Sequence, residues 1–425
     1  MDSFLDELRW RGMLHQATPH VEQHLSSAPR LGYIGFDPTA PSLTIGNYVQ
    51  VMLLLLFQRA GHRPIVLLGG ATGRIGDPSG KDAERTLLDL DTLQRNLQAQ
   101  MTQFKSLLDF EGPHAAIMVD NYAFYSDMNV LDFLRDIGKH LTVNYMMAKE
   151  SVKKRLETGI SFTEFSYQLL QAYDFLRLYQ DYGCTVQMGG SDQWGNIVSG
   201  IELIRRKLQR TDVHAITTPL LTKSDGSKFG KSEQGNIWLD PNLTSPYQFY
   251  QFWINTDDAD VPKFTRYFSL RPRLEIEEME ASGDMLVMKG VLAEELTERI
   301  HGKEALRNVQ HVSRLLFDKR LTAETLPAIP EQAWEMIRQE IPTATLYRAM
   351  LAHPIDTLLS DALQIFTSKS EVRRFAQQNA LRINKQKVAD VHTSLGINDF
   401  IHGKYLLLEK GKKNKFLLVL DDTHS

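Results

Sequence analysis

Short apolar segments alternate with stretches of helical periodicity through the first half of this 425-residue chain. The strand candidates are Leu31–Gly35, Ile65–Leu68, Ala115–Val119, Thr185–Met188 and Ile216–Leu220. Helical candidates lie between most of them, an alternation that is typical of a parallel sheet with helices on both faces. The sequence therefore predicts an α/β domain whose ligands bind at the carboxyl ends of its strands.

The pattern changes in the second half of the chain. Strand signals fade from Tyr247 to about Phe317, where helical spacing predicts a small helical domain. Prolines after position 325 then predict a linker around one short helix at Glu331–Glu340. A helix candidate at Glu371–Phe375 and a strand candidate at Leu381–Lys385 indicate a final α+β module. The predicted domains are 1–225, 226–325, 326–355 and 356–425.

Charge is distributed unevenly along the chain, which carries a net charge of −4. Between Gln364 and Leu420 there are 11 Lys and Arg against 4 Asp and Glu, a charge of +7 that leaves −11 on the remainder. A basic compact segment is typical of phosphate-backbone binding. Its apolar runs, such as Leu406–Leu408, argue against a disordered tail. We therefore expect this module to bind a nucleic acid.

Cysteine content and hydropathy indicate the cellular compartment of the protein. The single cysteine, Cys184, allows neither an internal disulfide nor a thiolate metal cluster and is interpreted as a small buried residue. The acidic, amphipathic start Met1–Glu7 lacks the features of a secretion signal. The most apolar run, Val51–Phe57, is shorter than the roughly 20 residues that cross a bilayer. We expect a cytoplasmic protein without a membrane partner.

A polar segment with a glycine follows the first predicted strand and leads into a long apolar helix. Ser42 is predicted to cap this helix, and Thr44 and Asn47 to be neighbours on its first turn. Gly46 lets a ligand approach the backbone closely. Because helix amino termini bind phosphates, the segment is a candidate phosphate site. Ordinary capping of a core helix is the alternative.

The loop Lys223–Ser232 is a second candidate phosphate site. Its lysines and small hydroxyl residues surround glycines, a composition expected of a mobile loop that closes on a polyphosphate. A solvated lysine-rich loop is the alternative.

The predicted helix Phe162–Phe175 has one polar face. Tyr167, Gln171 and Asp174 share that face because they lie at positions i, i+4 and i+7. Polar groups on a buried face need partners, and a bound polar ligand would supply them. An exposed polar stripe is the alternative.

The two phosphate candidates resemble the H-I-G-H and K-M-S-K-S signatures of class I aminoacyl-tRNA synthetases. They read Thr44-Ile45-Gly46-Asn47 and Lys228-Phe229-Gly230-Lys231-Ser232, so the first lacks both histidines. Over nearly the whole chain the sequence resembles bacterial tyrosyl-tRNA synthetases, through the helix above and through Gly32–Asp37, Gly76–Lys81 and Gln187–Asn196. This resemblance implies a Rossmann-like catalytic domain, a helical domain and a small α+β RNA-binding module, without an editing domain.

The resemblance also implies a role for each matched residue. Tyrosine would be bound by Tyr33, Asp77, Tyr167, Gln171, Asp174 and Gln187, with Tyr33 and Asp174 on its hydroxyl. ATP would be contacted by Asp37, Gly46, Asp192, Gln193, Lys231 and Ser232, and its phosphates would be surrounded by the catalytic set Thr39, Thr44, Asn47, Lys228 and Lys231. RNA would be bound by Lys369, Arg373 and Arg374. ATP would be a substrate that brings Mg²⁺, with no dedicated metal site and no tightly bound cofactor.

The implied partners are L-tyrosine, ATP and the tRNA for tyrosine, in a homodimer with a candidate interface at Met128–His140.

Two alternative functions remain. A tryptophanyl-tRNA synthetase shares the fold and chemistry, but would not be expected to carry the Tyr33 and Asp174 pair or the basic tail. An RNA-binding protein descended from a synthetase would explain the altered first signature, but not the retained lysines and tyrosine pocket.

Overall fold

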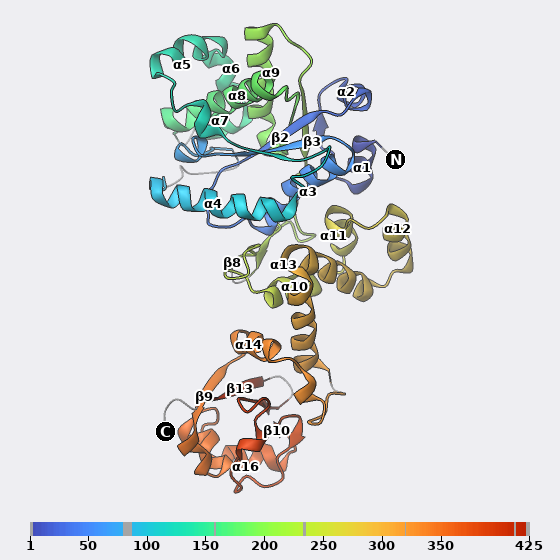
Figure 1. Ribbon diagram of the computed structural model, residues 1–425, viewed down its shortest axis with the longest axis vertical. Helices are drawn as coiled ribbons and strands as arrows, with labels where there is room; N and C mark the ends of the chain where they lie inside the picture. Colours follow the sequence, from blue (N-terminus) through green and yellow to red (C-terminus); the bar gives the residue numbers. More distant parts are fainter. Residues whose placement is uncertain are drawn as a thin grey trace. The chain divides into compact units, whose positions relative to one another are not determined.

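The computed structural model describes residues 3–79, 87–156, 159–232, 235–318, 320–411 and 414–421. The chain forms two compact units, of which the first comprises Met1–Thr244 and Phe252–Leu296 and the second Ser245–Gln251 and Thr297–Ser425. Figure 1 shows a sheet with flanking helices in each unit. Gly80 and Lys81, which belong to one of the motifs above, lie outside the described residues.

The first unit is built on a six-stranded sheet. Its strand order is β1 (Gln16–Ala17), β6 (His214–Thr218), β5 (Val186–Gly190), β2 (Leu31–Phe36), β3 (Arg63–Leu68) and β4 (Ile117–Asp120). Strands β2 to β6 pair in parallel and β1 pairs antiparallel with β6. The predicted parallel sheet is confirmed, with strand ends displaced by one or two residues. The two-residue strand β1 is too short to give a sequence signal.

The parallel register gathers the carboxyl ends of the strands along one edge. Phe36 pairs with Leu68, Leu68 pairs with Asp120, and Gly190 pairs with Thr218. The loops that follow these strands therefore leave the sheet side by side, where open parallel sheets bind their ligands.

Helices cover both faces of this sheet (Figure 1). On one face, a Cβ at Gly32 would lie 2.8 Å from Phe57 of α3 (Ile45–Arg59). On the other, Tyr33 packs on Phe175 of α8 (Phe162–Tyr182), with ring centroids 5.4 Å apart. Further helices of the chain are α1 (Phe4–Arg11), α2 (Val21–Ser27), α4 (Leu90–Leu107), α5 (Val130–Asp136), α6 (Val143–Met147), α7 (Glu150–Leu156), α9 (Trp194–Leu208), α10 (Pro246–Ile254), α11 (Val261–Phe268), α12 (Arg273–Ser282) and α13 (Met285–Phe317). Within the described ranges, none of the helices has the length and apolar character that crossing a membrane requires.

The helix α3 begins after Thr44, not after Ser42. The Thr44 N–H donates to Asn47 Oδ1 at 3.0 Å and Thr44 Oγ1 accepts from the Asn47 N–H at 3.3 Å, which together form a capping box. The prediction that Ser42 caps the helix is wrong, because the Ser42 hydroxyl instead accepts hydrogen bonds from Gln103 and from the backbone of Asp240.

The second unit contains a five-stranded sheet. Its order is β11 (Gln386–Lys387), β10 (Leu381–Ile383), β12 (Tyr405–Lys410), β13 (Asn414–Asp421) and β9 (Thr343–Tyr347). It is accompanied by α14 (Glu331–Glu340), α15 (Ile355–Thr357) and α16 (Lys369–Gln377). The predicted helices at Glu331–Glu340 and Glu371–Phe375 and the strand at Leu381 are confirmed.

The interval 326–355, predicted as a linker, contains α14 and β9, and both belong to the folded second unit. β9 pairs in parallel with β13, and Trp334 of α14 stacks on Tyr405 with ring centroids 5.8 Å apart. The prolines mark the ends of short elements, since Pro330 precedes α14 and Pro342 precedes β9. The two units divide after Thr244, after Gln251 inside α10 and after Leu296 inside α13, and not at a linker.

We expect Gly200→Val to lower the free energy of unfolding by about 2 kcal/mol, as overpacked cores do. A Cβ at Gly200 of α9 would lie 2.9 Å from Cδ1 and 3.0 Å from Cβ of Phe175 on α8, so the two helices would have to separate. Urea unfolding measures the loss. Gly290→Val is the matched control, because a Cβ on that helical glycine meets nothing within 4 Å; equal losses at both positions would contradict this packing argument.

Candidate active site

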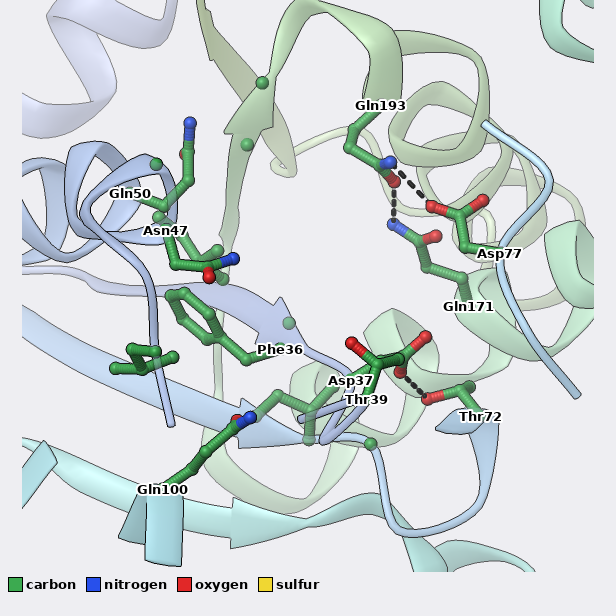
Figure 2. Close-up of a pocket in the computed structure, with 18 of the residues that line it drawn as sticks. Phe36, Asp37, Thr39, Asn47, Gln50, Thr72, Asp77, Gln100, Gln171 and Gln193 are labelled. Carbon is green, nitrogen blue, oxygen red and sulfur yellow. Dashed lines mark hydrogen bonds between the residues drawn. The ribbon is translucent and has the colours of Figure 1, made fainter. Parts of the chain in front are cut away.

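A cavity of about 520 Å³ opens at the carboxyl edge of the first sheet (Figure 2). Predicted site residues that line it are Tyr33, Asp37, Thr39, Thr44, Gly46, Asn47, Asp77, Tyr167, Gln171, Asp174, Gln187, Asp192 and Gln193. The structure thus brings the tyrosine candidates and most nucleotide candidates together. Lys228 and Lys231 are not among the lining residues.

A buried carboxylate and a buried phenol mark one part of this cavity. The Tyr33 hydroxyl has no hydrogen-bond partner among the described residues and Tyr33 is 1% exposed. Asp174, 2% exposed, accepts hydrogen bonds from Asn121 at 3.0 Å and from the Tyr125 hydroxyl at 2.8 Å. Burial raises the pKa of Asp174 to about 8, although both hydrogen bonds favour its ionised form. A ligand hydroxyl that donates to Asp174 and pairs with Tyr33 would satisfy both groups.

The carboxylate of Asp37 is linked to Asp174 by a chain of hydrogen bonds. Asp37 accepts from the Thr72 hydroxyl at 2.7 Å and from the Tyr167 hydroxyl at 2.9 Å. The Asn121 amide that binds Asp174 also donates to Thr72 Oγ1 at 3.0 Å. These contacts fix the orientation of Asp37 and Asp174 before any ligand enters, which lowers the cost of ordering them on binding.

Side-chain amides surround the third carboxylate, Asp77. Gln193 donates to it at 2.7 Å, and Gln171 approaches Gln193 at 3.5 Å (Figure 2). The Oε1 atoms of Gln171 and Gln187 are buried without a hydrogen-bond partner in the described part of the chain. Buried acceptors and carboxylates together favour a ligand that brings N–H donors and positive charge.

The amino terminus of α3 forms another part of the cavity wall. Gly46 lies at its first turn, where a Cβ would come 3.5 Å from Thr44 Oγ1 and 3.9 Å from the Phe229 carbonyl oxygen. Figure 2 shows the Asn47 amide directed toward the cavity. The helix dipole makes this end electropositive. The cavity therefore combines a carboxylate-rich region with an end suited to an anion.

The Lys228–Ser232 loop lies against the start of α3. A Cβ at Gly230 would come 3.1 Å from the Gly46 nitrogen, and the Ile45 N–H donates to the Ile237 carbonyl at 2.9 Å. Phe229 is buried and stacks on Phe268, with centroids 5.3 Å apart. The buried phenylalanine thus anchors a loop whose two lysines are exposed.

Electrostatics link this loop to the cavity. Burial and the charge of Asp77 raise the pKa of Asp192, and the charge of Lys228 opposes that rise. The side chain of Ser232 lies outside the described part of the chain.

Sequence reasoning missed Thr72, Asn121 and Tyr125, which hold the carboxylates in place. Asn121 directly follows β4, so the rule that points to the carboxyl ends of strands could have found it. Tyr125 gave no comparable signal, because its partner lies 49 residues away in the chain.

The three predicted RNA-binding residues lie on α16, and each contacts a different partner. Lys369 forms an ion pair with Asp361 at 3.2 Å, and Arg373 forms one with the buried Asp356 at 2.7 Å. Arg374 lies over the ring of Phe375, with its guanidinium carbon 5.9 Å from the centroid. Arg373 therefore also has a structural partner within the second unit.

The chain matches the family model of class I tRNA synthetases for tryptophan and tyrosine over residues 28–318. It therefore belongs to this family of class I aminoacyl-tRNA synthetases. A second model, for the C-terminal domain of SYY-like tyrosine–tRNA ligases, matches residues 334–418.

The relatives that match over nearly the whole chain are named tyrosine–tRNA ligases. The tyrosine–tRNA ligase of Porphyromonas gingivalis is 49% identical over 431 residues, covering 99% of this chain and 100% of the relative. That of Cytophaga hutchinsonii is 48% identical and covers 98% of this chain and 99% of the relative. Among solved structures, a C-terminally truncated mitochondrial tyrosyl-tRNA synthetase of Aspergillus nidulans is similar with a TM-score of 0.67 and 31% identity, over 75% of this chain and 95% of that one.

The raised pKa of Asp174 predicts a pH dependence of stability. An aspartate titrates near 3.9 in an unfolded chain, but Asp174 titrates at about 8 in the fold. Between these values the folded state holds the proton that the unfolded state has released, so stability falls as pH rises. Relative to Asp174→Asn, the wild type should lose on the order of 2 kcal/mol between pH 5.5 and 7.5. Urea unfolding at the two pH values measures this; parallel behaviour of both proteins would contradict the shift.

Proposed function

We propose that this chain is a tyrosine–tRNA ligase. It activates L-tyrosine with ATP to tyrosyl-adenylate, releases pyrophosphate, and transfers the tyrosyl group to the 3′ end of its tRNA. The observation that carries this proposal is the pair of Tyr33 and Asp174, buried in the same cavity as the amino terminus of α3.

The hydroxyl of the substrate gives the selectivity. In the proposed complex it donates to Asp174 and is hydrogen-bonded to Tyr33, whose own hydroxyl otherwise has no described partner. Phenylalanine would leave the Tyr33 hydroxyl buried and unpaired, and Asp174 would lack the hydrogen bond from the substrate. Sites that bind a substrate hydroxyl in this way reject the analogue without it by roughly 10⁴–10⁵-fold, a range whose upper end was measured on a tyrosyl-tRNA synthetase.

The remaining roles follow the charge of the cavity. We assign the substrate ammonium group to Asp77, Tyr167 and Gln171, and the orientation of the amino acid to Gln187. The adenosine and ribose are assigned to Asp37, Gly46, Asp192 and Gln193, with Lys231 and Ser232 also on the ATP side. The phosphates are assigned to Thr39, Thr44, Asn47, Lys228 and Lys231.

This division suits the reaction. A carboxylate that attacks the α-phosphorus needs alignment and neutralisation of charge more than a general base. The carboxylate region binds the cationic ammonium group, and the helix terminus with the two exposed lysines binds the polyphosphate. ATP enters as its Mg²⁺ complex, because Mg²⁺ retains water ligands and binds chiefly through substrate phosphates.

The tRNA is assigned to the basic second unit. Lys369, Arg373 and Arg374 remain the proposed phosphate contacts, and the first two would exchange a carboxylate for a phosphate when RNA binds.

Cys184 is buried, and burial raises the pKa of its thiol to about 12. This is consistent with a structural thiol in a reducing cytoplasm, where we place the enzyme.

We also propose a homodimer through the exposed apolar face of α5. On this helix Val130 is 67%, Leu131 70% and Leu134 49% exposed. A patch of this kind is costly in water and typical of an interface. It includes part of the candidate interface Met128–His140.

Leu131→Glu should convert dimer to monomer, because a carboxylate buried at the interface is desolvated without a partner. Sedimentation equilibrium measures the mass. The control is Leu274→Glu on α12, a leucine equally open to solvent at 72% exposure. A dimer that survives Leu131→Glu, or one that Leu274→Glu dissociates, would contradict this choice of face.

Purified protein should exchange labelled pyrophosphate into ATP when tyrosine is present, and neither phenylalanine nor tryptophan should support the exchange. Tyr33→Phe should reduce the preference for tyrosine over phenylalanine, because the site then lacks one of the two hydroxyl contacts. Exchange with tryptophan instead of tyrosine would refute the assignment. If none of the three amino acids supports exchange although the protein still binds tRNA, the chain would instead be an RNA-binding descendant of a synthetase.

A further inference from the structure

The helix α4 places a row of buried and half-buried side-chain amides beside the active-site cavity. Asn96, Gln100 and Gln103 lie at positions i, i+4 and i+7 and share one face of the helix. Asn96 is 5% and Gln100 3% exposed, on the same helix as the buried Leu97 and Phe104. An amide buried among apolar side chains is unfavourable unless its hydrogen bonds are made.

All three amides bind the loop that joins β2 to α3. Asn96 Nδ2 donates to the Pro38 carbonyl at 3.1 Å, and Gln100 Nε2 donates to the Ala40 carbonyl at 3.0 Å. Gln103 binds twice, since its Oε1 accepts from the Leu43 N–H and its Nε2 donates to Ser42 Oγ, both at 2.8 Å. We call this set of four hydrogen bonds the amide ladder. It holds the loop at regular intervals from Pro38 to Leu43.

This loop carries the residues proposed to surround the ATP phosphates. Thr39 lies within it and Thr44 follows it directly, and both line the cavity. Pro38 and Pro41 have no N–H groups, which limits the hydrogen bonds that the loop can make for itself. The position of Thr39 and Thr44 therefore depends on contacts from outside the loop.

The amide ladder also reaches the segment that follows the lysine loop. The Ser42 hydroxyl that accepts from Gln103 accepts a second hydrogen bond from the Asp240 N–H at 3.1 Å. The Leu239 N–H donates to the Leu43 carbonyl at 2.9 Å. One end of the ladder thus joins the loop that bears Thr39 to the segment that follows the lysine loop.

We infer that Asn96, Gln100 and Gln103 are positioning residues for adenylate formation, because their amide ladder sets the loop that presents Thr39 and Thr44 to the polyphosphate. This inference rests on the proposed function. Figure 2 shows the amide end of Gln100 directed toward the cavity, and its Oε1 is buried without a described partner. The ladder acts at the phosphate end and touches neither Tyr33 nor Asp174.

A purely structural loop anchor is the competing interpretation, and kinetics separate the two. Misplacement of a reacting group by about 1 Å can cost roughly 10²-fold in rate. Gln103→Leu should therefore slow single-turnover adenylate formation about 10- to 100-fold at a temperature well below melting. The Kd for tyrosine should stay within about twofold of the wild type.

The matched control is Gln98→Leu, the same substitution on an exposed position of α4, which should leave rate and affinity unchanged. Gln103→Glu keeps an acceptor for the Leu43 N–H and should recover part of the lost rate. If Gln103→Leu does not fold, Asn96→Asp serves in its place. It conserves size but sets a carboxylate oxygen against the Pro38 carbonyl, and the same selective loss of rate is expected.

Two results would overturn the inference. One is a wild-type rate in Gln103→Leu or Asn96→Asp. The other is a loss of tyrosine affinity in parallel with the loss of rate, which is the behaviour of a general structural defect. If the wild type and Gln98→Leu also lacked tyrosine-dependent activity, the proposed function would be refuted first, and the role of the ladder with it.

Discussion

The parallel pairing of β2 with β3 and β5 is the constraint on which the site depends. It places the ends of β2, β3 and β4 in register, and sets Tyr33 beside Gln187 in the neighbouring strand. Residues far apart in the chain, from Tyr33 to Trp238, therefore line a single cavity. A slip of one residue in this register would turn Tyr33 away from α8 and toward α3.

The cavity is organised by charge. Asp37, Asp77 and Asp174 are held by hydrogen bonds from neutral side chains, among them Thr72, Asn121 and Gln193. At Asp77, the neutral donor Gln193 leaves the carboxylate charge available for a cationic ligand, whereas an arginine partner would cancel it. The α3 terminus presents the opposite polarity. The proposed reaction uses this separation, with the ammonium group of tyrosine at one region and the polyphosphate at the other.

Strand ends and helix faces are local signals, and they located the sheet and part of the cavity wall. The resemblance to tyrosyl-tRNA synthetases supplied other lining residues, among them Tyr33, Asp77 and Gln187. Tyr167, Gln171 and Asp174 were found from spacing on one helix, and all three line the cavity. Sequence reasoning failed in three places. The Ser42 cap was wrong because Asn47 completes a capping box with Thr44 instead. The interval 326–355 was predicted as a linker because prolines are common in flexible segments, but prolines also mark the ends of short helices and strands. The amides of α4 gave no signal, since their partners are mainly backbone atoms about 60 residues away.

The central claim is that Asp174 accepts a hydrogen bond from the hydroxyl of tyrosine. Titration calorimetry at pH 7, in two buffers of different ionisation enthalpy, tests it directly. With a pKa of about 8, Asp174 is mainly neutral in the free protein at this pH. In the proposed complex, donated hydrogen bonds from Asn121, Tyr125 and the substrate hydroxyl together favour the ionised form of Asp174. The account predicts that tyrosine binds with release of a proton, that Asp174→Asn releases none, and that phenylalanine binds far more weakly. Equal affinity for tyrosine and phenylalanine, with no proton released, would contradict it.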